Sequence, residues 1–457
     1  MNRIPFKSFL LAIATLAVLA GCADRLNVLP TQSIDEQNAL NTPNDVAVTL
    51  IGAYDGVQDG DVLGGAFQYI PDLLGDNQEV RFGGTFGSHQ EIWNKAIAKN
   101  NIQVATTWID SYNAINRVNN VLSAIDKVKG DSKGRIEGEA RFLRGYVYFE
   151  LVKLYAKAWG DGVNATNPGV PLVLTPTRVV DAASNVKRSS VAEVYAQVID
   201  DLTKAESLLP AANGFYATKA AAAAVLSRVY LMQLNYLGAR DAANRVIASN
   251  RYKLTDTYEE NFNTFLNYGG ADPTETVFSI QINQQDGNNS LNTFYGVTLS
   301  SVPGTAGRGD VRIQPKHTQS YEPGDDRGTF FTRVGSFVYS LKFVDRFGNV
   351  PLIRLAEMYL TRAEANSRLG TTTGATPLAD INLIRARALL PALTAVDIAA
   401  ILKERKIELM FEGQLLPDLK RTRRSVGTLA WNADALVLPI PQRETDANPV
   451  ITQNPGY

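Results

Sequence analysis

The sequence of 457 residues contains a single cysteine, Cys22, and only two histidines, His89 and His317. One cysteine cannot form a disulfide within the chain. One cysteine and two histidines are also too few for the usual structural zinc site, which has four cysteine or histidine ligands. The composition therefore excludes a disulfide framework, and we expect no metal and no cofactor. The role of Cys22 must follow from its position in the chain.

An excess of charge of one sign is also missing, because 45 basic residues stand against 46 acidic ones. This balance does not favour a nucleic-acid partner. The short basic run 420–424 is better explained as a solvated face or as helix-end charges, and the tripeptide Arg308-Gly309-Asp310 is too short to indicate adhesion. After the N-terminal segment, no apolar run approaches the length of a membrane-spanning helix.

Catalytic motifs are absent as well. The sequence has no G-x-S-x-G, no H-E-x-x-H and no Walker phosphate loop. A carboxylate pair for glycoside hydrolysis stays open among the acidic residues, but no pattern selects one. Asp59 and Asp61 could help to hold calcium, although the ligand spacing of a known calcium loop is missing. We expect a binding protein and not an enzyme.

The N-terminal segment 1–21 is typical of a signal peptide. Arg3 and Lys7 give it a basic start, and its apolar stretch 9–20 is too short to span a membrane. It ends in Leu19-Ala20-Gly21-Cys22, which resembles the lipobox of bacterial lipoproteins. The resemblance implies cleavage before Cys22 and acylation of that residue, with palmitate among the expected chains, since two or more chains are needed for stable anchoring. The alternative is a cleaved secretory signal with an incidental cysteine.

The remaining 457 − 21 = 436 residues carry apolar positions at helical spacing over most of their length. Thr42-Pro43-Asn44-Asp45 and the pair Ser190 and Glu193 are helix-start signals. Helices are predicted at 46–57, 92–99, 106–128, 135–155, 190–209, 217–236, 239–249, 352–369, 377–390 and 397–411. The expected fold class is therefore mainly α.

Two of the predicted helix pairs are alike. The stretches LSRVYL at 226–231 and LAEMYL at 355–360 each place a tyrosine four residues after a leucine. A glycine break and a second helix rich in small residues follow each one. Helix pairs of about 34 residues with such contacts are the tetratricopeptide pattern, in which each pair buries its face by stacking on its neighbours. We expect a tetratricopeptide-like helix-pair scaffold; the alternative is two unrelated helix pairs.

Two regions interrupt the helical pattern. Residues 59–88 contain seven glycines and several aromatic residues, which predicts a long loop. Residues 254–350 are rich in glycine and asparagine, with one alternating stretch at Phe278, Ile280 and Ile282 that is typical of a strand. We therefore expect four parts: a signal peptide at 1–21, a helical region at 22–253, a loop-rich and partly β ligand-binding insertion at 254–351, and a helical region with an extended tail at 352–457.

Several stretches resemble, in the expected order, the SusD/RagB family of outer-membrane nutrient-binding lipoproteins. The strongest is LPIPQRETDANPVITQNPGY at 438–457. The others are ARFLRGYVYFELVKLYA at 140–156, RLAEMYLTRAEA at 354–365, and ERKIELMFEG with DLKR at 404–413 and 418–421. The resemblance covers nearly the whole chain after Cys22 and is weakest in 59–88 and 254–350. One departure is Leu415-Leu416-Pro417, where family members often carry an arginine and aromatic residues.

This resemblance implies a helical body whose loops carry the ligand site. It implies a lipid-anchored protein of the outer membrane, facing the cell exterior, that binds a glycan or peptide oligomer as a nutrient. The expected partner is a SusC-like TonB-dependent transporter, which the protein caps and supplies. Two other classes stay open: a tetratricopeptide-type lipoprotein scaffold for outer-membrane assembly, and an anchored glycoside hydrolase.

Aromatic residues in the glycine-rich loops are the expected ligand contacts, because the aromatic residues of the helices are needed for packing. An exposed ring can lie against a sugar or a peptide side chain while nearby polar groups fix the orientation. The candidate rings are Phe82, Phe86, Trp93, Tyr268, Phe294 and Tyr295, and the candidate polar contacts are Arg81, Asp76 and Asn77.

Overall fold

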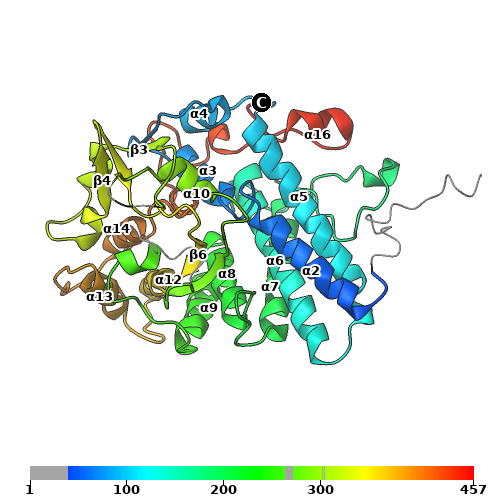
Figure 1. The fold of residues 1–457 in the computed structure, drawn as a ribbon, viewed down its shortest axis with the longest axis horizontal. Coiled ribbons are helices and arrows are strands. Elements are labelled where there is room, and N and C mark those ends of the chain that lie inside the picture. The colour runs from blue at the N-terminus through cyan, green and yellow to red at the C-terminus, as the bar shows by residue number, and fades with distance from the viewer. Residues whose placement is uncertain (1–39, 263–270, 301, 303) are drawn as a thin grey trace, which may run out of the picture.

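The computed structural model describes residues 40–262, 271–300, 302 and 304–457, so Cys22 and Tyr268 lie outside the described residues (Figure 1). The helices are α2 (Pro43–Gln58), α3 (Ala66–Leu74), α4 (Gly87–Asn94), α5 (Ile102–Ser123), α6 (Asp131–Tyr155), α7 (Val191–Leu208), α8 (Lys219–Met232), α9 (Tyr236–Ala248), α10 (Ser290–Tyr295), α11 (Pro315–Thr318), α12 (Leu355–Leu369), α13 (Pro377–Arg387), α14 (Ile398–Glu408), α15 (Leu415–Arg421) and α16 (Gln442–Ala447). The strands are β1 (Val80–Phe82), β2 (Thr276–Ile280), β3 (Val311–Ile313), β4 (Phe331–Val334), β5 (Phe337–Ser340) and β6 (Val350–Arg354). The mainly α prediction is confirmed. Within the described ranges, no helix combines the length and the apolar character needed to cross a bilayer.

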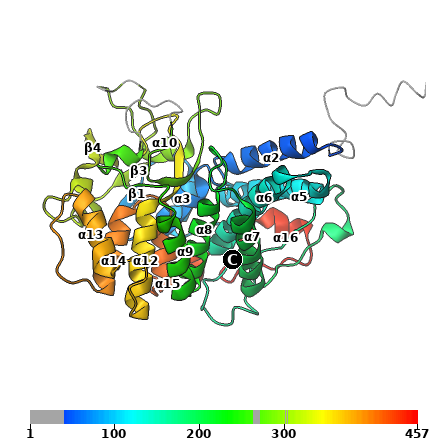
Figure 2. The same ribbon diagram turned by 90° about the horizontal axis from the view of Figure 1, so that it is seen from below.

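The helices form a continuous stack. Each of α5, α6, α7, α8 and α9 packs against the one before it, and α12 packs against both α9 and α13. Figure 2 shows α7, α8, α9, α12, α14 and α13 in a row, with β1, β3, β4 and α10 gathered on one side of them. Because the pair α8 and α9 stacks on the pair α12 and α13, the tetratricopeptide-like scaffold is confirmed.

The predicted helix-start signals are confirmed at atomic detail. The hydroxyl of Thr42 accepts from the backbone N–H of Asp45 at 3.2 Å, and the Asp45 carboxylate accepts from the N–H of Thr42 at 2.7 Å. Ser190 and Glu193 make the same exchange. Both pairs are capping boxes, which satisfy N–H groups that a helix start would otherwise leave unpaired.

The predicted loop over 59–88 is wrong in its middle. Residues 66–74 form α3, and all nine of its residues are buried. The sequence hid this helix because it is only nine residues long, lacks a side-chain cap and contains Pro71, a residue that disfavours a helix interior. Six of the seven glycines instead lie in the turns that flank α3 and β1, and the seventh, Gly87, begins α4.

A four-stranded antiparallel sheet, in the order β1-β3-β5-β4, covers one end of the helix stack. Its edge strand β1 comes from the region before the predicted insertion and pairs with β3 in the register Arg81↔Arg312. Strands β2 and β6 form a separate pair in which every residue is buried. The alternating stretch at 278–282 therefore predicted a strand correctly, but both of its faces lie in the core.

Buried ion pairs join the second strand pair to the helices. Arg354, at the end of β6, pairs with Glu275 at 2.6 Å, with Glu408 at 3.0 Å and with Glu412 at 2.7 Å. Burial alone would raise the pKa of Glu412, but Arg354 and then Lys342 hold this pKa below its usual value. Removing one partner from such a cluster leaves an uncompensated buried charge, so the cluster fixes how β6 and α14 fit together.

Candidate functional site

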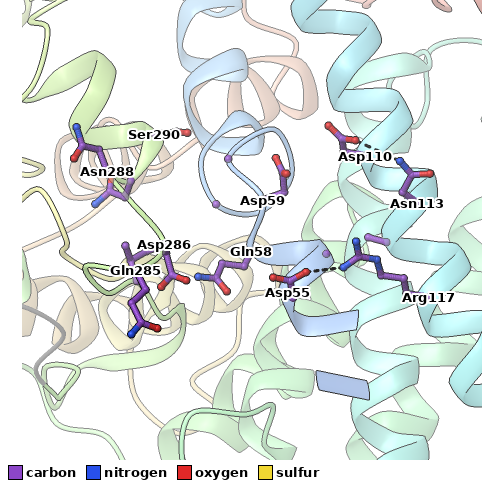
Figure 3. A pocket seen from close by; sticks show the side chains of 16 residues that line it. Asp55, Gln58, Asp59, Asp110, Asn113, Arg117, Gln285, Asp286, Asn288 and Ser290 are labelled. Carbon is purple, nitrogen blue, oxygen red and sulfur yellow. Dashed lines mark hydrogen bonds and ion pairs between the residues drawn. The ribbon is translucent and has the colours of Figure 1, made fainter. Parts of the chain in front are cut away.

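An open cavity of about 480 Å³ lies where the first helices meet the segment that leads into α10. One side is formed by the end of α2 and the exposed face of α5, and the other by residues 282–290 (Figure 3). The side chains that line it are almost all acids and amides. Those labelled in Figure 3 are Asp55, Gln58, Asp59, Asp110, Asn113, Arg117, Gln285, Asp286, Asn288 and Ser290.

Glycine shapes the floor of this cavity. The chain leaves α2 in a tight turn in which the N–H of Gly64 donates to the carbonyl of Asp59 at 3.0 Å. A Cβ on Gly64 would lie 2.1 Å from the carbonyl oxygen of Gln58, so no other residue fits there. Gly60 and Gly65 likewise leave room for the side chain of Ser290 at the start of α10. The glycine-rich sequence after α2 is thus a packed turn that holds α10 against the helices.

The opposite wall is fixed by Asn289, which is the N-cap of α10. Its side-chain oxygen accepts from the N–H of Asn292 at 2.6 Å, and its amide donates to the carbonyl of Gly348 at 2.7 Å. Asn289 is buried, whereas Gln285, Asp286 and Asn288 are exposed. Because Asn289 anchors this segment, the polar side chains before it can face the cavity.

The cavity is negatively charged. Its lining contains four carboxylates, those of Asp55, Asp59, Asp110 and Asp286, and one guanidinium, that of Arg117. Arg117 pairs with Asp55 at 2.7 Å. Four carboxylates against one guanidinium leave a local charge of −3. Partial burial, and then the nearby Asp59, raise the pKa of Asp110. A ligand in this cavity would be one that offers hydrogen-bond donors, such as hydroxyl groups, and carries no negative charge.

Three carboxylates meet beside the cavity. Ligand atoms of Asp59, Asp61 and Asp110 lie within 4.8 Å of one another. Carboxylate oxygens of this kind are ligands for hard cations such as Ca²⁺. In this structure the half-buried Asp61 accepts a hydrogen bond at 2.5 Å from the amide of Gln103. Burial raises the pKa of Asp61, against the effect of that hydrogen bond and together with the charges of the other two acids.

A group of packed rings lies at the other end of α10. His89 on α4 stacks on Phe82 with ring centres 5.6 Å apart, and its ring centre lies 4.4 Å from that of Phe294 on α10. Burial, and then the charge of Arg308, lower the pKa of His89 to about 4, so the imidazole is neutral at neutral pH. Phe86 covers the outer side of this group and is 42% exposed. It is therefore an exposed ring on a rigid, buried support.

The structure places the candidate rings in different surroundings. Phe82 and Tyr295 are each 1% exposed, and Phe294 is 8% exposed. The exposure expected of these three rings is wrong, because they pack against other aromatic side chains of the core. Trp93 is half-buried and donates its indole N–H to Asp76 at 3.0 Å. Phe86 alone among the described candidates keeps a large exposed face, and Tyr268 lies outside the described residues.

The candidate polar contacts divide in the same way. Asp76 is buried, and its carboxylate accepts from the backbone N–H groups of Glu79 and Val80 at 2.8 and 2.9 Å. The Asp76 carboxylate thus stabilises the turn into β1, and both of its oxygens already accept hydrogen bonds within the protein. Asn77 is half-buried, and its backbone carbonyl accepts from the ammonium of Lys316 at 2.8 Å. Arg81 is exposed on β1, close in sequence to Phe86.

Sequence reasoning missed the residues that the sheet brings beside Phe86. The guanidinium of Arg308 lies over the Phe86 ring at 4.6 Å and forms an ion pair with Asp310 at 2.8 Å. Arg312, on β3, lies over the exposed ring of Phe337 at 3.8 Å. The alternation of Arg308, Asp310 and Arg312 is the signal that could have indicated a strand with one charged face.

The sequence matches two family descriptions and many known proteins. Residues 26–231 match a family described as starch-binding and associating with the outer membrane, and residues 344–436 match the SusD family. A SusD-like protein of Formosa agariphila is 26% identical over 98% of both chains, and another from the same organism is 24% identical over 97% of this chain and 98% of that protein.

Solved structures share the fold. A putative sugar-binding protein of Bacteroides vulgatus gives a TM-score of 0.80 at 26% identity, over 92% of this chain and 99% of that chain. A laminarin-binding SusD-like protein gives a TM-score of 0.75 at 24% identity, over 91% of this chain and all (100%) of that chain. The likeness thus extends through the helix stack and the sheet alike.

Proposed function

The chain belongs to the SusD/RagB family, and from this premise we propose that it binds a glycan oligomer at the outer membrane and delivers it to a SusC-like TonB-dependent transporter. The proposed activity is binding without cleavage. A lipid on Cys22 would hold the protein at the membrane, with the loops and the sheet turned to the exterior.

The observation that carries this proposal is an exposed ring next to a cavity rich in hydroxyl-binding groups. Ser290, at one end of α10, lines the cavity, and the Phe294 ring near the other end lies 6.1 Å from the ring of Phe86. These two positions on α10 are about 6 Å apart at 1.5 Å per residue. One oligomer can therefore place a sugar ring against Phe86 and neighbouring hydroxyl groups among the acids and amides of the cavity.

A carbohydrate ligand is also supported by the relatives. Solved proteins of the same fold are described as sugar-binding and as laminarin-binding. A peptide ligand would offer only one backbone N–H donor per residue, and its backbone carbonyl groups cannot bind to the carboxylates of the cavity, because carboxylates only accept hydrogen bonds. The hydroxyl groups of a glycan can donate to each of them.

The test is Phe86→Ala, measured by calorimetry against glycan oligomers that the wild-type protein binds in a screen. We expect a loss of roughly 1–3 kcal/mol in binding free energy, because a central ring contributes about this much. Since Phe86 is 42% exposed, the melting temperature should change little. Chromatography should recover the glycan uncut.

Phe215→Ala is the matched control, because Phe215 is 63% exposed in the segment between α7 and α8. It should leave glycan affinity unchanged. Equal affinity of the Phe86→Ala variant and the wild type would show that the site is elsewhere. Binding of oligopeptides without any glycan would overturn the proposed ligand class.

A further inference from the structure

Two arginines without acidic partners lie side by side on the sheet. Arg81 on β1 and Arg312 on β3 are directly opposite each other in the antiparallel register. Opposite residues of such a pair have Cβ atoms roughly 4.5–5.5 Å apart on one face, where like charges are destabilising. Within the described part of the chain, neither guanidinium forms an ion pair with a carboxylate. The sheet thus keeps an unfavourable contact that an anion would relieve.

Arg312 is held in position by groups other than an acid. Its guanidinium lies over the Phe337 ring at 3.8 Å and donates to the carbonyl of Gly83 at 3.4 Å. A Cβ on Gly83 would lie 2.5 Å from the Cζ of Arg312, so only glycine leaves room for this placement. The Nε of Arg312 has no hydrogen-bond partner among the described residues. This Nε is buried, so the side chain is oriented in advance with its inner donor enclosed by the protein.

The neighbouring Arg308 continues the same charged face toward Phe86. Its charge is offset by Asp310, which is 5% exposed and lies 2.8 Å away. This face therefore has a net charge of +2, from the three arginines Arg81, Arg308 and Arg312 and the one carboxylate of Asp310. The cavity on the far side of α10 carries the opposite sign, so the electrostatic potential changes along the proposed binding path.

We propose that the glycan is anionic, and that Arg81 and Arg312 together bind one of its carboxylate or sulfate groups. This inference rests on the proposed function and adds the ligand's chemical class. The planar guanidinium suits both oxyanions, because its N–H groups can donate in pairs to two oxygens. Arg312 lies on β3, and Arg308 lies just before this strand, with its guanidinium over the Phe86 ring. The charged groups of the oligomer lie on the sheet, and a neutral part lies toward the acidic cavity.

The test uses three probes of similar length: oligogalacturonate for carboxylate, a carrageenan oligosaccharide for sulfate, and neutral maltohexaose. Affinities are measured for the wild type and for Arg81→Gln and Arg312→Gln. At low salt the wild type should prefer at least one charged probe by about tenfold or more, and this preference should shrink as salt screens the charges. Either substitution should remove most of the preference without lowering the melting temperature, because it also removes the repulsion between the arginines. Comparison of the two charged probes tells carboxylate from sulfate.

Arg333→Gln is the matched control. Arg333 is an exposed residue of β4 that lies opposite Val338 of β5. Val338 in turn lies opposite Ile313 of β3, so Arg333 and Ile313 are on the same face of the sheet. Arg333 therefore lies on the other face of the sheet from Arg312 and should leave the preference intact. Equal affinity of the wild type for charged and neutral probes would overturn the inference and leave the proposed function standing. Binding of no oligosaccharide would overturn the proposed function itself, and a preference that survives both substitutions would place the anion site elsewhere.

Discussion

Asp72 is a carboxylate enclosed by the core of the protein. It lies in α3, accepts from the hydroxyl of Tyr295 at 3.4 Å and from the N–H of Gly413 at 3.2 Å, and is 2% exposed. Its second oxygen has no partner among the described residues. Burial raises the pKa of Asp72 from 3.8 to about 7, because the charged form is poorly solvated there.

The shift gives a prediction about pH. A folded-state pKa above the unfolded value means that the native state binds the proton more tightly, so this group lowers stability progressively from pH 4 to pH 7. Asp72→Asn removes that dependence. The free energy of unfolding of the variant relative to the wild type should rise between pH 5 and pH 8 by on the order of 1–3 kcal/mol. Urea denaturation at the two pH values measures it, with the exposed Asp131→Asn as control; parallel pH profiles for Asp72→Asn and the wild type would contradict the prediction.

At the residue level, the sequence predicted the kind of side chain in the site better than its position. Arg81 and Phe86 were identified because they lie in a glycine-rich, aromatic stretch, and both are exposed. Phe82 belongs to the same stretch, but it faces inward because β1 alternates buried and exposed residues. A three-residue strand gives no periodic signal of its own. Which residues of β1 point inward is determined only by its pairing with β3, which lies far along the chain.

At the element level, helix α2 forms the floor of the cavity at one end and begins with a capping box at the other. It is 16 residues long, which is about 24 Å. The Thr42 end should therefore affect the stability of the helix without affecting the ligand. Thr42→Ala should lower the free energy of unfolding by about 1 kcal/mol, because the hydroxyl that accepts from the N–H of Asp45 is lost.

Chemical denaturation together with glycan titration checks this prediction. Affinity should stay at the wild-type value. Val48→Ala, at a position on α2 that is 57% exposed, is the control and should change stability much less. A Thr42→Ala variant with normal stability and weakened binding would show that the two ends of α2 are coupled.

Elements with a clear cap or a clear apolar period could be predicted from the sequence, whereas α3, which has no side-chain cap and contains a proline, could not. The helices α2 and α7 were found from their capping boxes. The basic run 420–424 was interpreted as a solvated face or as helix-end charges. Lys420 and Arg421 do lie in the last turn of α15, but Arg421 is buried and pairs with Glu364 at 2.7 Å. That outcome depends on a partner on α12, which no local pattern reveals.

At the scale of the whole molecule, the proposed anchor and partner can be tested together. Wild-type protein should be released from the outer membrane only by detergent, and mild detergent should co-purify a large β-barrel in near-equal amount. Cys22→Ser should leave the protein uncleaved or soluble in the envelope, because the acyl chains that give stable anchoring are absent. Cell fractionation and gel analysis measure both. A Cys22→Ser protein that still requires detergent, or a wild-type protein recovered alone, would contradict the anchor or the lid role respectively.

The pairing of β1 with β3 has a consequence for how the protein matures. Thr85 and Arg308, which meet beside Phe86, are 223 positions apart in the chain. During synthesis, β1 emerges long before its partner strand, and until β3 is made it presents an unpaired edge that invites aggregation. The arginine pair exists only once the later segment has arrived and aligned in register. A copy truncated before β3 would lack the partner strand of β1, and with it Arg312 of the arginine pair.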